Sequence, residues 1–358
     1  MSELMRQKHK KPINLRNALH LCIALAMLCC TAACAVRPAV GERTFTDSLG
    51  REISLPAQIT KVAPSGSASQ MVLFALCPDL LVGTSSPWEE QELQFIPEKY
   101  HSLPALGQLY GGKGDLNLEA LMDTGAQVIV DIGQAKDGAA EEMDALQEQT
   151  GIPVVHISGN LAAMGDVYRI LGELLSMESE AEALADYCER VYARAETMCE
   201  SVDKVGLIYV TGSKGLNVIA RGSYHAQLID MFGDNLAVLD DPSSKGSGNE
   251  VDMEQILLWD PPVVIFAPGS IYHTVHDDPA WRNVQAIKNG TYYETPLGPY
   301  NWLGSPPSVQ RYLGLMWLGT TLYPQAAYYD LQQEVTEYFR LFYHCELSSQ
   351  QYEALLQP

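Results

Sequence analysis

The chain has 358 residues, with 23 Lys and Arg against 44 Asp and Glu, and a formal net charge of −21 at pH 7. Because nucleic acids and anionic lipids are bound through clustered basic side chains, this balance argues against both as charge partners. The length exceeds that of one comfortable hydrophobic core and predicts two lobes.

Residues 1–33 have the layout of a secretory signal peptide and are not counted as part of the fold. A basic segment, residues 6–16, precedes an apolar stretch, residues 18–30, that is shorter than the ~20 residues a spanning helix needs. Small residues then lead into Cys34, which is typical of a cysteine that becomes an acylated N-terminus. We therefore predict lipidation at Cys34, a tether over residues 34–42 and an extracytoplasmic protein anchored to the membrane. Simple cleavage with release of the protein is the alternative.

Cysteine spacing predicts buried free thiols. Beyond the signal and Cys34 the chain has Cys77, Cys188, Cys199 and Cys345, and none of them forms a C-x-x-C pair. This spacing favours neither a zinc ribbon nor a redox motif. Cys188 and Cys199 share one predicted helix and would lie roughly 16 Å apart, which is too far for a disulfide.

The first half of the mature chain alternates between strand-like and helix-like segments. Residues 43–56 predict a hairpin, because Asp-Ser-Leu-Gly at 47–50 separates two alternating segments. The segments that follow predict a parallel sheet with helices on both faces. The predicted strands are 61–64, 80–83, 128–132 and 153–157, and the predicted helices are 70–76, 118–122 and 139–150.

Two helical segments separate the halves. Residues 164–175 and 178–202 carry apolar side chains at helical spacing, and the second could extend about 37 Å as one helix. Strands are then predicted at 205–210 and 262–267, and helices at 224–232, 252–258, 280–288, 309–322 and 325–342. The predicted α/β organisation is an N-terminal lobe over 43–160, a connecting helix over 161–203 and a C-terminal lobe over 204–358.

One short phrase occurs in both halves. Asn117-Leu118-Glu119 and Asp252-Met253-Glu254 each place a Glu at the head of a helix that precedes an apolar strand. The helix dipole favours a carboxylate in the first turn, which explains either Glu alone. It explains the matching positions in two lobes less well.

In these features the chain resembles the class III periplasmic binding proteins of ABC importers, which take up vitamin B12, haem and iron siderophores. The resemblance covers nearly the whole mature chain and rests on the 47–51 hairpin, the two Glu helices, and residues 281–293, 299–308 and 317–324. It implies two Rossmann-like lobes joined by a single long interdomain helix, with the ligand in the cleft. It also implies a monomer without a cofactor or metal of its own, whose partner is a permease dimer that Glu119 and Glu254 contact.

In open α/β sheets the loops after the strands line the cleft. Ser67 offers a hydroxyl at a helix start, and Arg221 could hold a carboxylate or oxyanion unless it is a solvated surface charge. The other candidates are aromatic or imidazole side chains, for which a packed core position is the alternative. The predicted ligand-binding residues are Ser67, Trp88, Tyr110, Arg221, Tyr224, His225, Tyr300 and Trp302.

The expected function is capture of an iron chelate, haem or corrinoid outside the membrane and its delivery to the permease. An oxyanion such as molybdate or tungstate, held by Arg221, hydroxyls and amides, is the nearest alternative. A cell-surface hydrolytic enzyme with His225 as base is a different class. It is disfavoured because the sequence presents no convincing set of nucleophile, base and orienting group.

Overall fold

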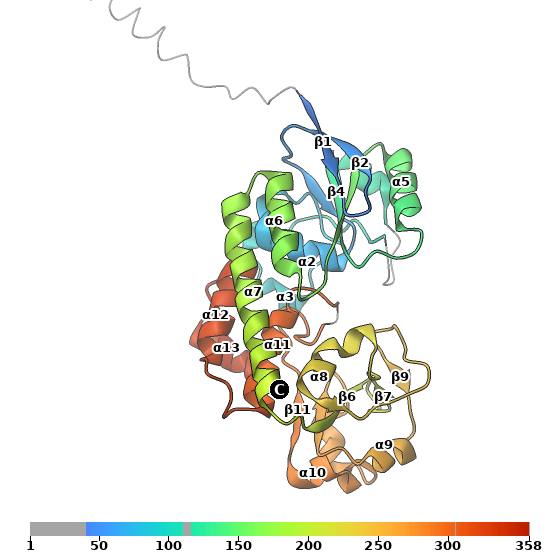
Figure 1. Cartoon of the computed structure of the whole chain (residues 1–358), viewed down its shortest axis with the longest axis vertical. Coiled ribbons are helices and arrows are strands. Elements are labelled where there is room, and N and C mark those ends of the chain that lie inside the picture. Colours follow the sequence, from blue (N-terminus) through green and yellow to red (C-terminus); the bar gives the residue numbers. More distant parts are fainter. Residues whose placement is uncertain (1–40, 110–115, 305, 358) are drawn as a thin grey trace, which may run out of the picture. The chain divides into compact units, whose positions relative to one another are not determined.

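Two separate sheets form the centres of two lobes, and long helices run between them (Figure 1). The computed structural model describes residues 41–109, 116–304 and 306–357. The predicted signal peptide, Cys34 and Tyr110 therefore lie outside the described residues. Residues 42–358 belong to one compact unit.

The N-terminal lobe begins with an antiparallel hairpin and continues as a parallel sheet. Strands β1 (Glu42–Thr46) and β2 (Glu52–Pro56) pair as predicted, and the Asp47 carboxylate accepts the Leu49 and Arg51 amides at 3.0 Å. The sheet has the order β3-β4-β5, all parallel. Its strands are β3 (Val62–Pro64), β4 (Val128–Gly133) and β5 (Val154–Ser158), and its helices are α2 (Ser67–Leu76), α3 (Glu90–Leu93), α4 (Leu118–Asp123) and α5 (Ala139–Thr150).

One predicted strand of this lobe is wrong. Residues 80–83 form no strand: Pro78 opens a 3-10 helix, Pro78–Leu80, and a single bridge then joins Leu81 to Val62. A Cβ at Gly83 would collide with Leu106, so the chain at this point passes too close to its neighbour for a regular side-chain-bearing strand.

The two connecting helices are confirmed. Helices α6 (Met164–Leu175) and α7 (Glu178–Ser201) pack against each other and are joined through Ser176, which is left-handed at φ 57°. None of the helices in the described part of the chain is both long and apolar enough to cross a bilayer.

The C-terminal lobe is built on a mixed sheet. Its parallel part runs in the order β11-β10-β6, and the two-residue strands β7 and β9 extend it in the antiparallel direction. Segments this short carry no periodic signal, which is why the sequence did not predict them. The strands are β6 (Gly206–Thr211), β7 (Asn217–Val218), β8 (Asp234–Asn235), β9 (Asn249–Glu250), β10 (Val263–Phe266) and β11 (Tyr292–Glu294), and the helices are α8 (Gln227–Phe232), α9 (Met253–Trp259) and α10 (Gln285–Asn289).

The last three helices pack on both lobes. They are α11 (Arg311–Leu322), α12 (Leu331–Phe342) and α13 (Ser349–Leu356). The Phe339 ring of α12 lies 5.1 Å from that of Phe95, and His344 Nε2 lies 3.1 Å from the Phe74 carbonyl oxygen. A lobe boundary at residue 204 remains a prediction, because the C-terminal helices complete the core of the first lobe.

An aromatic cluster fastens α7, α11 and α12 together. Tyr187 of α7 lies edge-on to Tyr312 of α11 and to Tyr338 and Phe342 of α12, with ring centroids 5.4–6.5 Å apart. Tyr338 and Phe342 stack at 4.2 Å. Such pairs add about 0.5–1.5 kcal/mol each beyond burial, so the long helix is held along its side.

The prediction of free thiols is confirmed, and that of burial holds for two of the four. Cys77, Cys188, Cys199 and Cys345 are all unpaired; the first two are buried, whereas the other two are partly exposed. Burial raises the pKa of Cys77 to about 12, so its thiol stays protonated and unreactive.

Glu334 of α12 bridges two arginines of α7. Its carboxylate accepts Arg190 Nη1 at 2.9 Å and also pairs with Arg194, while its side chain is only 10% exposed. We expect Glu334→Gln to lower the free energy of unfolding by about 1–3 kcal/mol, because it leaves the guanidinium groups short of a partner. Glu337→Gln, which removes the more exposed partner of Arg190, should cost under about 1 kcal/mol. Urea unfolding measures both, and equal losses would contradict the special role of Glu334.

Candidate functional site

A cavity of about 240 Å³ lies where the two lobes meet. It is bordered by α2, α3 and the segment before α3 on one side, and by the loop after β11 on the other. Helix α2 follows β3 and the loop follows β11, so both lie at carboxyl ends of parallel strands, where α/β sheets bind ligands. The lining residues are Ser67, Gln70, Ser85, Ser86, Gln91, Glu92, Leu297, Pro299, Tyr300, Asn301 and Pro306.

The first-lobe wall is a hydrogen-bonded set of hydroxyl and amide groups. Ser67 Oγ lies 2.9 Å from Ser85 Oγ and donates to Gln108 Oε1 at 3.3 Å. Gln70 Oε1 accepts the Ser85 amide at 2.6 Å and its hydroxyl at 2.9 Å. Each of these groups has a partner already, so the wall is ordered before any ligand arrives.

The second-lobe wall is a loop anchored from behind. Asn301 donates to the Tyr209 hydroxyl at 3.0 Å and accepts the Leu303 amide at 2.8 Å. Trp302 is completely buried and donates to the Gly298 carbonyl at 3.1 Å. Together these bonds hold Tyr300 at the cavity.

A carboxyl and a phenol meet across the cavity. Glu92 is 7% exposed; its Oε2 accepts the Glu89 amide at 2.7 Å, and Tyr300 also hydrogen-bonds to it. Burial raises the pKa of Glu92 to about 7, against the opposing effect of these bonds. Burial, then the nearby Glu92 charge, holds the pKa of Tyr300 well above its usual value. The pair is therefore largely neutral below pH 7.

A chain of hydrogen bonds crosses the ends of the first-lobe strands. Ser158 Oγ lies 3.0 Å from His156 Nε2, and His156 Nδ1 lies 2.7 Å from Asp131 Oδ2. The other Asp131 oxygen accepts Ser65 Oγ at 2.5 Å. The order Ser-His-Asp resembles a hydrolase triad, but Ser158 does not line the cavity. The chain of bonds instead ties β3, β4 and β5 together next to α2.

Of the predicted ligand-binding residues, Ser67 and Tyr300 line the cavity. Trp88 does not: it is half-buried against Phe74, with ring centroids 5.7 Å apart, and donates to the Tyr100 carbonyl at 2.9 Å. Trp302 has no exposed surface, so its indole supports the loop from behind and does not reach a ligand in this structure.

Arg221, Tyr224 and His225 lie away from the cavity wall. Arg221 is exposed and pairs with Asp234, while its Nε donates to the Asn235 carbonyl at 2.6 Å. Its charge is therefore satisfied within the protein and does not face the cavity. Tyr224 and His225 sit in a short 3-10 helix, with ring centroids 5.7 Å apart, next to the buried Arg311.

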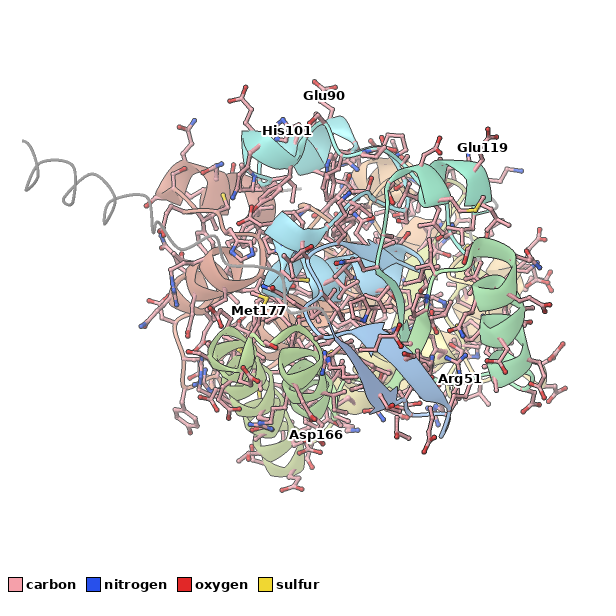
Figure 2. The ribbon with its side chains drawn as sticks, turned by 90° about the horizontal axis from the view of Figure 1, so that it is seen from above. Arg51, Glu90, His101, Glu119, Asp166 and Met177 are labelled. Carbon is pink, nitrogen blue, oxygen red and sulfur yellow. The ribbon has the colours of Figure 1, made fainter. Side chains whose placement is uncertain are left out.

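The two glutamates proposed to contact the permease are exposed on matching helices. Glu119 lies in the first turn of α4, which Asn117 caps by accepting the Ala120 amide at 3.0 Å. Figure 2 shows Glu119 at the periphery of the molecule. Glu254 lies in the first turn of α9, which Asp252 caps in the same way at 2.8 Å from Gln255.

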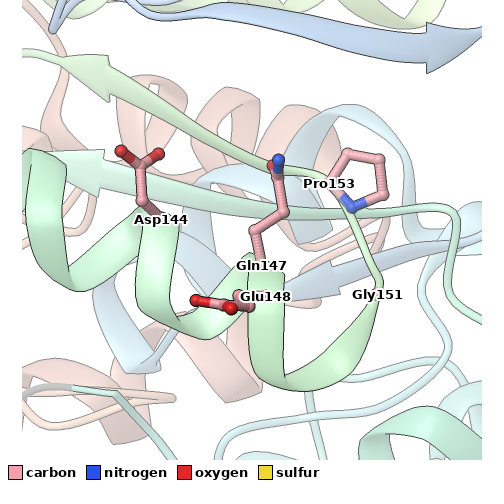
Figure 3. A pocket seen from close by; sticks show the side chains of 5 residues that line it. All are labelled: Asp144, Gln147, Glu148, Gly151 and Pro153. Atoms are coloured by element: carbon pink, nitrogen blue, oxygen red, sulfur yellow. The ribbon is translucent and has the colours of Figure 1, made fainter.

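A second hollow lies beside α5 and is a weaker candidate site (Figure 3). It is bordered by Asp144, Gln147 and Glu148 of that helix and by Gly151 and Pro153 after it. Asp144 is already bonded to Arg51 at 2.9 Å, and these side chains come from one helix and its turn. Among the described residues, no three His, Cys, Asp or Glu side chains are grouped to hold a metal ion.

Most residues of the cavity wall were not predicted from the sequence. Glu92 lies in the acidic segment Glu89-Glu90-Gln91-Glu92, which has the composition of a solvated surface. Its burial depends on the docking of a loop more than 200 residues away in sequence. Gln70, the polar residue that opens the otherwise apolar segment 70–76, is a signal that could have pointed to this wall.

The family and the fold are shown by comparison with known proteins. The model of the periplasmic binding protein family matches residues 84–297. An ABC transporter solute binding protein from Sulfurospirillum deleyianum is 27% identical over 88% of this chain and 99% of that one, with a TM-score of 0.80. No curated protein matched the sequence.

More distant structures share the fold. A periplasmic solute binding protein from Veillonella parvula is 24% identical, with 88% and 97% of the two chains covered and a TM-score of 0.73. The molybdate-bound periplasmic binding protein of Haemophilus influenzae is 20% identical, with 86% and 99% covered and a TM-score of 0.66. Because the family match spans more than half of the sequence, this chain belongs to the periplasmic binding protein family and is the non-enzymatic, extracytoplasmic solute-binding component of an ABC importer.

Proposed function

We propose that this binding protein captures an iron chelate, haem or corrinoid in the cavity between Ser67 and Tyr300. The observation that supports the proposal is the cavity itself, because both lobes contribute ordered polar groups to it. We also propose that the protein is anchored to the membrane through an acylated Cys34 and that it acts as a monomer. We do not propose a hydrolytic activity with His225 as base, because members of this family are transport components.

The cavity chemistry supports recognition of a polar group at one end of a chelate. Hydroxyls, amides, one phenol and one carboxyl line it, together with Leu297, Pro299 and Pro306. Its volume of about 240 Å³ is below the roughly 300–1,000 Å³ of pockets for drug-sized ligands. A chelate would therefore place one end inside and leave the rest between the lobes.

The same small volume favours a second candidate, an oxyanion such as molybdate or tungstate. The Haemophilus influenzae relative is described as bound to molybdate. An anion of that size fits entirely within the cavity, where the hydroxyls of Ser67 and Ser85 would exchange their present partners for it. Arg221, the basic residue expected to assist, is occupied by Asp234.

Delivery to the permease is proposed to use α4 and α9. On each helix an exposed large apolar side chain follows the glutamate by about one turn: Met122 after Glu119, and Leu257 and Leu258 after Glu254. A carboxylate beside an apolar side chain suits a partner that presents arginines within an apolar surface. Because Glu119 and Glu254 lie on separate lobes, contacts at both would fix the orientation of the protein on a two-fold permease.

Ligand identity can be tested with the intrinsic fluorescence of the five tryptophans. We expect Tyr300→Phe to weaken binding of the true ligand about tenfold, because one hydroxyl at the cavity is lost. Ferric siderophores, haem, cobalamin, molybdate and tungstate are titrated in parallel. Tyr328→Phe, at a phenol that is 92% exposed, is the matched control. Equal affinity of Tyr300→Phe and wild type for the ligand found would remove Tyr300 from the site.

The raised pKa of Glu92 predicts a pH-dependent stability. Because its folded-state pKa of about 7 exceeds the ordinary 4.5, the folded chain binds this proton more tightly, and stability falls as the pH rises from about 4.5 to about 7. Glu92→Gln removes this loss. The variant should gain up to roughly 3 kcal/mol relative to wild type between pH 4 and pH 8, measured by urea unfolding without ligand. A pH-independent difference would contradict the burial of a neutral carboxyl.

The docking proposal predicts a separation of binding from uptake. Glu119→Ala combined with Glu254→Ala should leave ligand affinity unchanged and abolish uptake, because the contacts with the permease are lost. The control combines Glu141→Ala with Glu353→Ala, which removes two exposed carboxylates from other helices. Radiolabelled uptake in cells or proteoliposomes decides the matter, and normal uptake by the first pair would refute the docking role.

A further inference from the structure

Arg311 is a buried cation without an acidic partner. It opens α11 and is only 3% exposed. Its Nη1 donates to Gln227 Oε1 at 3.1 Å and its Nη2 to the Tyr224 carbonyl at 3.1 Å. Its Nε, also buried, has no partner. All the groups that hold this guanidinium are formally neutral.

Several other half-buried arginines differ in this respect, whereas the half-buried Arg43 also bonds only to backbone carbonyls, those of Glu173 and Leu174. Arg51, Arg190 and Arg194 each pair with at least one carboxylate. Within the described ranges, no ion pair shorter than 4 Å includes Arg311. An unpaired buried charge costs several kcal/mol, and burial indeed lowers the pKa of Arg311. A counter-charge from outside the chain would offset this cost.

One face of the Arg311 guanidinium is covered by a partly exposed ring. The Tyr224 ring covers the guanidinium at 5.0 Å from its centroid and is itself 42% exposed. Gly304, at φ 102°, approaches so closely that a Cβ there would collide with the guanidinium. Burial, then the nearby Arg311, lowers the pKa of His225, which therefore adds no second positive charge at neutral pH.

Arg311 adjoins the ligand cavity through one loop. Pro306, which lines the cavity, lies between Gly304 and Arg311 in sequence, and the Gln310 side chain donates to its carbonyl. Ser308 of the same loop donates to the Ala68 carbonyl of α2 at 2.9 Å. A charged group of a ligand at the edge of the cavity would therefore be separated from the Arg311 guanidinium by this one loop.

We propose that Arg311 receives an anionic group of the transported solute, a carboxylate or an oxyanion, when the exposed Tyr224 ring moves off its face. The inference rests on the proposed solute-binding function and narrows it to ligands that carry negative charge. A guanidinium presents parallel N–H donors that match the two oxygens of such a group. Charge-assisted hydrogen bonds between Arg311 and the anionic group would offset the loss of its contacts with Gln227 and Tyr224.

The test compares three variants of the mature chain with wild type. Arg311→Met removes the charge while keeping an unbranched side chain. Gln227→Glu places a carboxylate where an oxygen already lies 3.1 Å from Nη1, so it supplies the counter-charge internally. Arg221→Met is the control, because that arginine is exposed and already paired with Asp234.

The probes separate the two sources of negative charge. Molybdate and phosphate are free oxyanions, ferric citrate carries carboxylates on a chelate, and a neutral ferric hydroxamate carries no net charge. We expect Arg311→Met and Gln227→Glu each to weaken binding of the anionic probe about 100-fold, and Arg221→Met to leave it unchanged. Whether the oxyanions or only ferric citrate bind wild type then identifies the source.

Thermal unfolding tests whether a loss of anion affinity in the variants is caused by a loss of stability. Because the buried charge is unpaired, Arg311→Met and Gln227→Glu should unfold at the same temperature as wild type or higher. Unchanged anion affinity in both variants would overturn the inference. Binding of the neutral hydroxamate alone, with all variants equal to wild type, would overturn it while leaving the solute-binding proposal intact. Binding of none of the probes by wild type would count against both.

Discussion

The arrangement of the molecule depends on the contact between α7 and the C-terminal helices α11 and α12. The rings of Tyr187, Tyr312, Tyr338 and Phe342 form one buried cluster, and Glu334 bridges two arginines of α7 beside it. Since α12 also reaches Phe95 in the first lobe, the lobes are restrained by more than a single helix. Hinge motion is therefore expected to be small, and a ligand meets a cavity whose walls are already positioned.

The chemistry of the site follows from which polar groups are satisfied within the protein. Ser67, Gln70 and Ser85 bond to one another, and Arg221 is neutralised by Asp234. Arg311 stands apart because it is almost fully buried and its partners carry no charge. A buried charge that lacks an oppositely charged partner is a natural place to look for a ligand.

The sequence predicted the fold well where the signal was long and periodic. Helix α5 and helix α6 begin and end at the predicted residues, and α12 starts later than predicted because Asp330 caps it by accepting the Gln333 amide. The site was predicted less well. Ser67 and Tyr300 were found from loop position, whereas Glu92 and Arg311 owe their burial to segments distant in sequence, and Trp302, chosen as a ligand contact, is core.

The pairing of Phe95 with Phe339 has a consequence for biogenesis. The hydrophobic interior around α2 and α3 cannot close until nearly the whole polypeptide has emerged from the ribosome. Contacts this distant in sequence slow folding, because a long loop must close before they form. A secreted chain of this design would stay loosely structured while it passes through a translocation channel, and would reach its final state only on the far side.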